Sequence, residues 1–235
     1  MPNNKRVLVN GCSFTTARSN VKNWPEHLPT EWKITNIAQH AAGNTWICDA
    51  TIVETIKNDY DLVLIMWSGL TRIDVTVDKL VWDQFWQFKS KNALDVYYGH
   101  CGIGDSPNYP MVEIAKPLIK YSCERDLVYL SLMNILKLQS WLKSKNIEYR
   151  FMSYMNYWNN GYIENNLKQP SVNLNLESLI KQIDFSKWIF DDDEKNGIFE
   201  LVKQQNLYTE DGTHPNSIAG NLWSKVILES FTCQK

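Results

Sequence analysis

Short apolar runs alternate along the chain with longer stretches in which apolar residues recur every three or four positions. Four runs have the length and composition of strands, at residues 5–10, 33–37, 61–67 and 147–154. Three longer stretches have helical spacing, at residues 45–58, 121–145 and 216–231. Continuous apolar runs are typical of strands that are covered on both faces. The alternating order therefore predicts an α/β fold with a parallel central sheet and helices on both of its faces.

Two stretches show neither pattern, and we expect irregular excursions there: about residues 78–120 and 155–195. Three aromatic residues in the first stretch suit a helix and are more typical of a core than of a sugar platform: Trp82, Phe85 and Trp86. Glycines and prolines between Gly99 and Pro110 indicate a loop. Residues 159–180 are polar and rich in asparagine, which is typical of a surface segment. Because no repeat or linker divides the chain, we expect one domain over residues 1–235.

The net charge and the cysteines indicate which partners and which cellular compartment to expect. The formal net charge is −2, so we expect no nucleic-acid partner, because phosphate binding needs clustered Lys and Arg. No stretch approaches the roughly 18 apolar residues of a membrane span, and the start of the chain does not resemble a secretory signal. The cysteines form no C-x-x-C pair, which favours reduced thiols and a cytoplasmic location over disulfides or zinc: Cys12, Cys48, Cys101, Cys123 and Cys233.

A hydroxyl side chain follows the first predicted strand, where the apolar run ends in Gly11-Cys12-Ser13. Ligands of parallel sheets collect at the carboxyl ends of the strands. A strand-to-helix turn at Ser13 would expose its oxygen and aim a helix amino terminus at a reacting carbonyl. The alternative is that Ser13 only caps a helix. Cys12 is a second candidate nucleophile, but neighbouring residues of a strand point in opposite directions, so we expect Cys12 to face the core.

An acid and a histidine stand close together near the other end of the chain, in Asp211-Gly-Thr-His214-Pro215. A serine hydroxyl is a poor nucleophile until a base takes its proton. His214 is a candidate for that base, and Asp211 for the group that orients the imidazole ring. The alternative is a simple turn, because Asp-Gly is a turn dipeptide and Asn216 or Ser217 can cap the last predicted helix.

Three motifs together resemble those of the SGNH/GDSL hydrolases, and in particular the small divergent kind found in bacteriophage genomes. The motifs are Gly11-Cys12-Ser13-Phe14, the segment from Asn36 to Gly43-Asn44-Thr45, and Asp211-Gly-Thr-His214. The resemblance implies a three-layer α/β/α sandwich of the flavodoxin type. It also implies that Ser13 is the nucleophile, that His214 and Asp211 complete a triad, and that the N–H groups of Gly43 and Ser13 bind the oxyanion. The implied chemistry needs no cofactor or metal.

The third motif of the family departs from the pattern, because the segment from Met66 to Arg72 contains no asparagine. In the family that asparagine donates to the oxyanion, and loss of one such donor typically lowers turnover by about 10²–10³. Three residues are candidates for a replacement or for binding substrate: Asn44, Ser68 and Arg72. Arg72 is equally well suited to a surface ion pair with Asp74. His40 and His100 have no spaced partners, so we expect no metal site there.

These observations favour a serine esterase or deacylase that acts on a small-molecule or glycan ester, and the resemblance suggests O-acetyl groups on carbohydrate. An alternative is a non-catalytic carbohydrate-binding or virion-associated protein with the same fold, since one oxyanion donor is missing. Acyl transfer to an alcohol other than water would use the same residues. If the chain is encoded by a bacteriophage, we expect it in the cytoplasm of the host cell or in the virion. The sequence does not indicate an oligomeric state.

Overall fold

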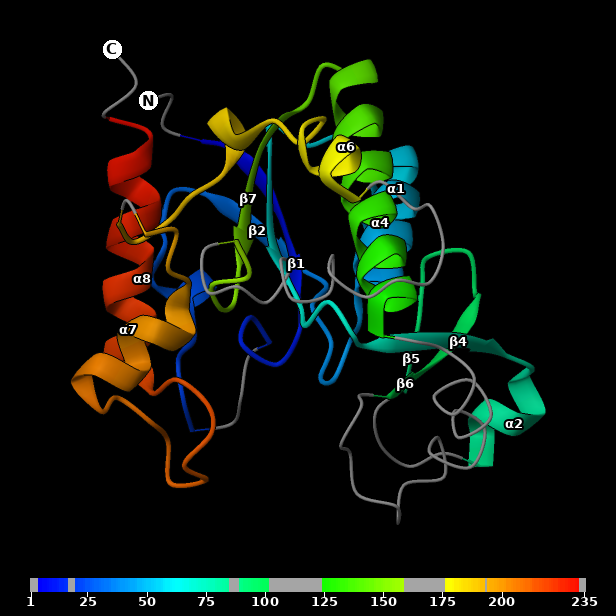
Figure 1. Ribbon diagram of the computed structural model, residues 1–235, viewed down its shortest axis with the longest axis horizontal. Helices are drawn as coiled ribbons and strands as arrows, with labels where there is room; N and C mark the ends of the chain where they lie inside the picture. The colour runs from blue at the N-terminus through cyan, green and yellow to red at the C-terminus, as the bar shows by residue number, and fades with distance from the viewer. Residues whose placement is uncertain are drawn as a thin grey trace.

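The computed structural model describes residues 4–16, 20–84, 89–101, 124–158, 176–192 and 194–232. Its central sheet contains four parallel strands in the order β2-β1-β3-β7 (Figure 1). The strands are β1 (Arg6–Gly11), β2 (Lys33–Asn36), β3 (Leu62–Trp67) and β7 (Glu148–Ser153). Gly11 pairs with Met66 and Trp67 pairs with Ser153. The carboxyl ends of β1, β3 and β7 therefore lie together at one edge of the sheet.

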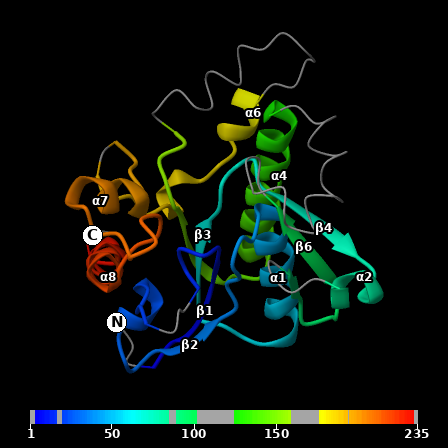
Figure 2. The ribbon, with the colours of Figure 1, turned by 90° about the horizontal axis from the view of Figure 1, so that it is seen from below.

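Helices cover both faces of this sheet, as Figure 2 shows. One face carries α1 (Asn44–Lys57) and α4 (Glu124–Ser144), and the other carries α7 (Ile198–Gln205) and α8 (Ser217–Ser230). A 3-10 turn at Trp24–His27 packs beside α8. The prediction of an α/β fold with a parallel central sheet is confirmed. The predicted strands and helices outside the irregular stretches agree with the structure to within a few residues at their ends.

The side chains of the central strands alternate between two apolar cores. On the side of α1 and α4 the core contains Leu8, Val63, Ile65, Trp46, Val128 and Leu132. On the side of α7 and α8 it contains Val7, Val9, Leu64, Ile198, Trp223 and Ile227. All six residues of β3 are buried, because both of its faces lie under helices. This explains why β3 appears in the sequence as a continuous apolar run rather than an alternating one.

The first stretch that was expected to be irregular contributes β5 and β6 to a second, antiparallel sheet in the order β4-β6-β5, and β4 directly precedes that stretch. The strands of this sheet are β4 (Ile73–Val77), β5 (Lys89–Lys91) and β6 (Tyr97–Cys101). The expectation of a loop is wrong at Gly99, which lies inside β6. Trp82 is in a short helix, α2 (Lys79–Gln84), as predicted, and its indole packs against Tyr97 with ring centroids 5.2 Å apart. Phe85, Trp86 and Pro110 lie outside the described residues.

The second stretch that was expected to be irregular contains one short helix, α6 (Leu176–Ile180), and a 3-10 turn at Phe185–Lys187. The predicted surface segment 159–180 lies outside the described residues up to position 175. The following helix α7 was not predicted from the sequence. It buries Ile198, Leu201 and Val202 against the core, and the Gly197 N–H at its start donates to Glu200 at 2.9 Å.

Candidate active site

Ser13 lies two residues beyond the end of β1, at the carboxyl edge of the central sheet. Residues 12–16 form a tight turn, in which the N–H groups of Thr15 and Thr16 donate to the Cys12 carbonyl at 2.9 and 3.1 Å. The expectation of a helix that starts directly at Ser13 is therefore wrong over these residues. Gly11 allows the close approach to β3 that this turn requires, because a Cβ atom there would lie 2.9 Å from the Met66 carbonyl oxygen.

His214 is presented by a compact loop between α7 and α8. The Thr209 N–H donates to the His214 carbonyl at 2.8 Å, and the Gly212 N–H donates to the Thr209 carbonyl at 2.9 Å. Gly212 has a φ of 69°, a left-handed conformation that favours glycine. Asn216 then caps α8 by accepting hydrogen bonds from the N–H groups of Ile218 and Ala219. Of the two residues considered as the cap, Asn216 and Ser217, the structure shows Asn216 in that role, and it fixes the loop to the start of α8, one face of which packs in the core.

Ser13, His214 and Asp211 are brought together although 201 positions separate the first two in the sequence. The Ser13 Oγ lies 3.0 Å from the His214 Nε2, and the His214 Nδ1 lies 3.0 Å from the Asp211 Oδ2. The other carboxylate oxygen accepts from the N–H groups of Thr213 and His214 at 2.8 and 3.1 Å. Asp211 is thus fixed by the loop backbone while one oxygen stays directed at the imidazole ring.

Ser13 is buried, whereas the other two side chains of this array are partly open to solvent. The side chains of His214 and Asp211 are 22% and 44% exposed. An exposed ion pair contributes little energy in water, so the value of Asp211 is in holding one ring orientation and one tautomer. The Thr213 hydroxyl also lies 2.8 Å from the His214 Nδ1, which gives that nitrogen a second neighbouring oxygen.

An aromatic wall borders the array. The Phe14 ring lies 5.4 Å from the His214 ring and 4.9 Å from the Tyr154 ring. Burial raises the pKa of Tyr154, so its hydroxyl stays protonated at neutral pH. Cys12 points the other way and is buried in the core under α7 and α8. The structure therefore places the hydroxyl of Ser13, and not the thiol of Cys12, beside His214.

The amino terminus of α1 is engaged differently from what the resemblance implies. The Gly43 N–H donates to the Asp74 carboxylate at 2.7 Å. Since that N–H already has an acceptor, the predicted oxyanion role of Gly43 requires Asp74 to move away. Among the described residues, by contrast, we find no hydrogen-bond acceptor for the N–H of Ser13. That group is available as an oxyanion donor.

Two of the predicted substrate-binding residues, Asn44 and Ser68, are in the interior. The Asn44 amide accepts the Ser68 N–H at 2.9 Å and donates to the Ser131 hydroxyl at 3.0 Å. In this structure both residues therefore connect α1 to the end of β3, and their burial argues against a direct contact with substrate.

Arg72 is only partly buried and lies beside Gly69 and Tyr154. A Cβ atom on Gly69 would lie 3.6 Å from the Arg72 Cγ and 3.8 Å from the Tyr154 hydroxyl. Arg72 thus remains a candidate contact to substrate at the rim of the site. The alternative of a surface ion pair between Arg72 and Asp74 is wrong, because the Asp74 side chain is fully buried and pairs with His100.

The expectation that His100 lacks partners is also wrong. Its Nδ1 lies 2.8 Å from the Asp74 Oδ1, and its Nε2 lies 2.7 Å from the Ser90 Oγ. These three residues come from the three strands of the second sheet. An alternating pattern of apolar and polar residues at 73–77 was the available sequence signal for the strand that carries Asp74.

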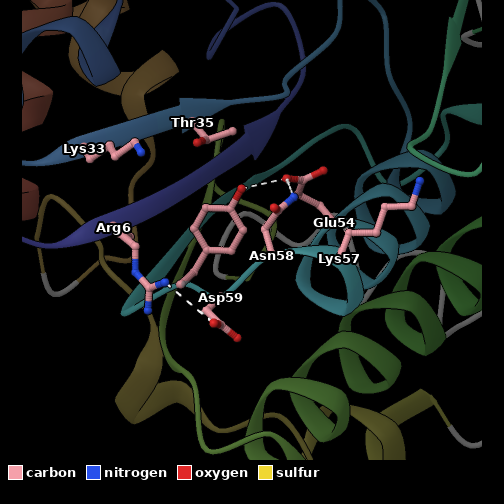
Figure 3. A pocket seen from close by; sticks show the side chains of 8 residues that line it. Arg6, Lys33, Thr35, Glu54, Lys57, Asn58 and Asp59 are labelled. Atoms are coloured by element: carbon pink, nitrogen blue, oxygen red, sulfur yellow. Dashed lines mark hydrogen bonds and ion pairs between the residues drawn. The ribbon is translucent and has the colours of Figure 1, made fainter.

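Among the cavities lined by described residues, two larger ones lie outside the Ser13 array. The first, of about 420 Å³, is shown in Figure 3 and lies at the opposite edge of the sheet, between the starts of β1 and β2 and the end of α1. Its polar groups pair with one another: Glu54 accepts from the Tyr60 hydroxyl at 2.6 Å and from the Asn58 amide at 2.8 Å. The second, of about 570 Å³, borders Asp211 and the start of α8. The second borders the array and can hold part of a substrate.

Two further observations concern metal binding and membrane crossing. Within the described ranges, no group of three or more His, Cys, Asp or Glu side chains is placed to hold a metal ion. In the same part of the chain, no helix combines the length and apolar character that crossing a membrane requires.

Comparisons with known proteins show the fold. No family model matches the chain, and no curated protein matches it. Among solved structures, the psychrotrophic esterase EstA from Pseudoalteromonas sp. is similar with a TM-score of 0.51 and 11% identity, over 97% of this chain and 96% of that one. A catalytic mutant of Axe2, an acetylxylan esterase from Geobacillus stearothermophilus, is similar with a TM-score of 0.51 and 12% identity, over 98% and 95% of the two chains. The chain therefore shares the α/β fold of these esterases over nearly its whole length.

Proposed function

We propose that the protein is a serine hydrolase of the SGNH type that cleaves a carboxylic ester through Ser13, His214 and Asp211. The observation that carries this proposal is the pair of 3.0 Å contacts that link the three side chains in the order hydroxyl, imidazole, carboxylate. A nucleophile within hydrogen-bond reach of a base, with the base oriented by a third group, is the arrangement that activates a serine.

The reaction proceeds in two halves. The Ser13 Oγ attacks the ester carbonyl carbon while its proton passes to the His214 Nε2. The tetrahedral intermediate collapses, the bond to the alcohol oxygen breaks, and His214 returns the proton to the leaving alcohol. A water molecule then attacks the acyl-enzyme while its proton passes to His214. The bond between the acyl carbon and the Ser13 Oγ breaks, His214 returns the proton to that oxygen, and the carboxylic acid leaves. The proton on Nδ1 stays directed at Asp211 and fixes the tautomer in which Nε2 can accept.

The oxyanion needs donors that are free to receive it. We assign the Ser13 N–H to this role, because no described residue accepts from it. Gly43 meets the same need only if Asp74 releases its N–H. Arg72 remains in the proposal as a substrate contact, where its guanidinium can hold the oxyanion or an anionic part of the substrate.

For the substrate class we propose O-acetyl esters of carbohydrates. The fold is shared with an acetylxylan esterase, which supports this class. The cavity that borders Asp211 contains Tyr208 and Glu210 beside the loop that carries His214, and it offers an aromatic ring and a carboxylate to a sugar.

Turnover of a generic aryl acetate tests the mechanism. We expect the unaltered protein to release the phenol and Ser13→Ala to be inactive. Cys12→Ala is the matched control, because it removes the neighbouring nucleophile and leaves the Ser13 array in place. Loss of activity in Cys12→Ala with retention in Ser13→Ala would refute the assignment.

A non-catalytic carbohydrate-binding or virion-associated protein is the second candidate. The observation that favours it is the shortage of oxyanion donors, since the N–H of Gly43 and the amide of Asn44 both have other partners. It predicts no turnover of any ester, and ligand binding that Ser13→Ala leaves unchanged. Acyl transfer is distinguished from hydrolysis by adding an acceptor alcohol and identifying the products.

A further inference from the structure

The second sheet contains a buried carboxylate that holds the start of α1. Asp74 accepts the Gly43 N–H on one oxygen at 2.7 Å and the Trp46 N–H on the other at 2.6 Å. The imidazole of His100 lies 2.8 Å from the first oxygen. The side chains of Asp74 and His100 are both 0% exposed. The first turn of α1 is therefore capped by a residue from a different element, 31 positions along the chain from Gly43.

His100 and Ser90 hold this carboxylate in turn. Asp74 and His100 face each other across the β4–β6 pair, and the far nitrogen of His100 lies 2.7 Å from the Ser90 Oγ. The Trp46 ring covers His100 edge-on, with the ring centroids 5.8 Å apart. Ser90 and His100 are only 5% and 2% exposed. This second Ser-His-Asp array is closed to a substrate, so its role is in placing Asp74.

The energetics make this cap difficult to displace. The first N–H groups of a helix have no partner within the helix, and a carboxylate there satisfies them and complements the helix dipole. Removing one member of a buried charged network leaves the other groups unpaired, which is far more costly than losing a surface contact. Gly43 also has no room for a side chain, since a Cβ atom would lie 2.8 Å from an Asp74 oxygen.

The capped turn is connected to the edge of the sheet that carries Ser13. Asn44, the first residue of α1, accepts the Ser68 N–H at 2.9 Å directly after β3. One turn further along, the Ile47 carbonyl accepts from the Asn10 amide at 3.0 Å, three residues before Ser13. The start of α1 therefore contacts the ends of both β1 and β3. A shift of α1 would move the backbone around the nucleophile.

We propose that Asp74, held by His100 and Ser90, is a positioning residue for the ester hydrolysis, which acts through the first turn of α1 on the geometry around Ser13. This inference rests on the proposed function, because it concerns the same reacting hydroxyl. It assigns Gly43 to the capped turn rather than to the oxyanion. It also gives the second sheet a task in the reaction.

The test compares Asp74→Asn, His100→Asn and the control Asp95→Asn in turnover of an aryl acetate. Asp95 lies between β5 and β6, is exposed, and forms an ion pair with Lys91 at 2.9 Å. All kinetics are measured at a temperature where unfolding curves show each variant fully folded. We expect kcat of Asp74→Asn to fall on the order of 10²-fold, as for an ångström-scale misplacement of a reacting group, with little change in KM. His100→Asn should lower kcat less, and Asp95→Asn should leave it unchanged.

A folded Asp74→Asn variant with the kcat of the unaltered protein would overturn the inference. A rise in KM with no change in kcat would also overturn it. If Asp74→Asn fails to fold, His100→Asn decides by the same criterion.

Hydrogen exchange of backbone amides separates this inference from the proposed function. We expect faster exchange at Trp46 and at Ser68 in Asp74→Asn. Unchanged exchange at Ser68 would refute the connection even if the unaltered protein hydrolyses no ester.

Discussion

At the scale of single residues, catalysis by His214 requires its ring proton to be on Nδ1, so that Nε2 can accept the serine proton. The Asp211 Oδ2 and the Thr213 Oγ1 both lie within 3.0 Å of the Nδ1. The ionised carboxylate can only accept, whereas a hydroxyl can also donate. We therefore assign the control of the tautomer to Asp211 and a supporting role to Thr213, whose hydroxyl donates to the Asp211 Oδ1 at 2.9 Å.

This assignment predicts unequal effects of two substitutions. Asp211→Asn should lower kcat by about 10⁴, because an amide that donates to Nδ1 leaves the proton on Nε2, where it blocks the acceptance of the serine proton. Thr213→Val, the control, removes a neighbouring hydroxyl but keeps the carboxylate and should have a much smaller effect. Steady-state kinetics on an aryl acetate provide the comparison. Equal losses in the two variants would contradict the assignment.

The base itself gives a second prediction at this scale. His214→Ala should lower turnover on the order of 10⁶-fold, and adding Ser13→Ala to it should cost little more, because residues that act as a unit are not additive. A double-mutant cycle with the two single variants and the double variant measures this. Additive losses would mean that Ser13 and His214 act independently, contrary to the 3.0 Å contact between them.

At the scale of elements, the position of the His214 loop depends on how closely α8 packs on the chain before the Trp24–His27 turn. A Cβ atom on Gly220 would lie 2.8 Å from the Lys22 carbonyl oxygen and 3.0 Å from the backbone of Asn23 and Trp24. All three neighbours are backbone atoms, which cannot rotate away as a side chain can. The helix that follows the His214 loop can therefore pack this closely only because residue 220 has no side chain.

Gly220→Ala is therefore expected to destabilise the protein, although an alanine inside a helix is normally about 1 kcal/mol better than a glycine. Overpacking of this kind costs about 1–3 kcal/mol. Urea unfolding curves compare the variant with Asn221→Ala, an exposed neighbour that should change stability by about 0.5 kcal/mol or less. A higher unfolding midpoint for Gly220→Ala would show that α8 packs less closely than the structure indicates.

At the scale of the whole molecule, much of the fold follows from the sequence because its strongest patterns are local. The run at β3 and the helical spacing at α1, α4 and α8 each depend on neighbouring residues alone. The meeting of Ser13 and His214 was predicted because the carboxyl ends of parallel strands share one edge. The remaining features depend on pairings between distant residues.

The second sheet shows what local patterns miss. Its strands are three to five residues long, and the register that sets Asp74 opposite His100 joins residues 26 positions apart. Periodicity identifies neither the pairing nor the burial of that carboxylate. The Gly43 N–H donates to Asp74 because of the same pairing. The motifs contain no sign of this contact, so the resemblance alone assigned that N–H to the oxyanion.

Buried tyrosines predict how the whole molecule responds to alkaline pH. Burial raises the pKa of Tyr60 to about 12 and also raises the pKa of Tyr98 and Tyr149. The folded state therefore keeps protons that the unfolded chain loses near pH 10. The stabilising contribution is complete below about pH 10 and is lost as the pH rises through the folded-state pKa values. Urea unfolding between pH 9 and 12 should show declining stability, and Tyr60→Phe should make the decline shallower. Constant stability across this range would contradict the burial of these rings.

The most direct test of the central claim is covalent trapping of the nucleophile by a fluorophosphonate, with the modified residue located by peptide mass spectrometry. The account predicts one adduct, on Ser13, that is lost in Ser13→Ala and greatly slowed in His214→Ala, and that persists in Cys12→Ala. A folded protein that forms no adduct, or one whose adduct lies on a residue other than Ser13, would contradict it.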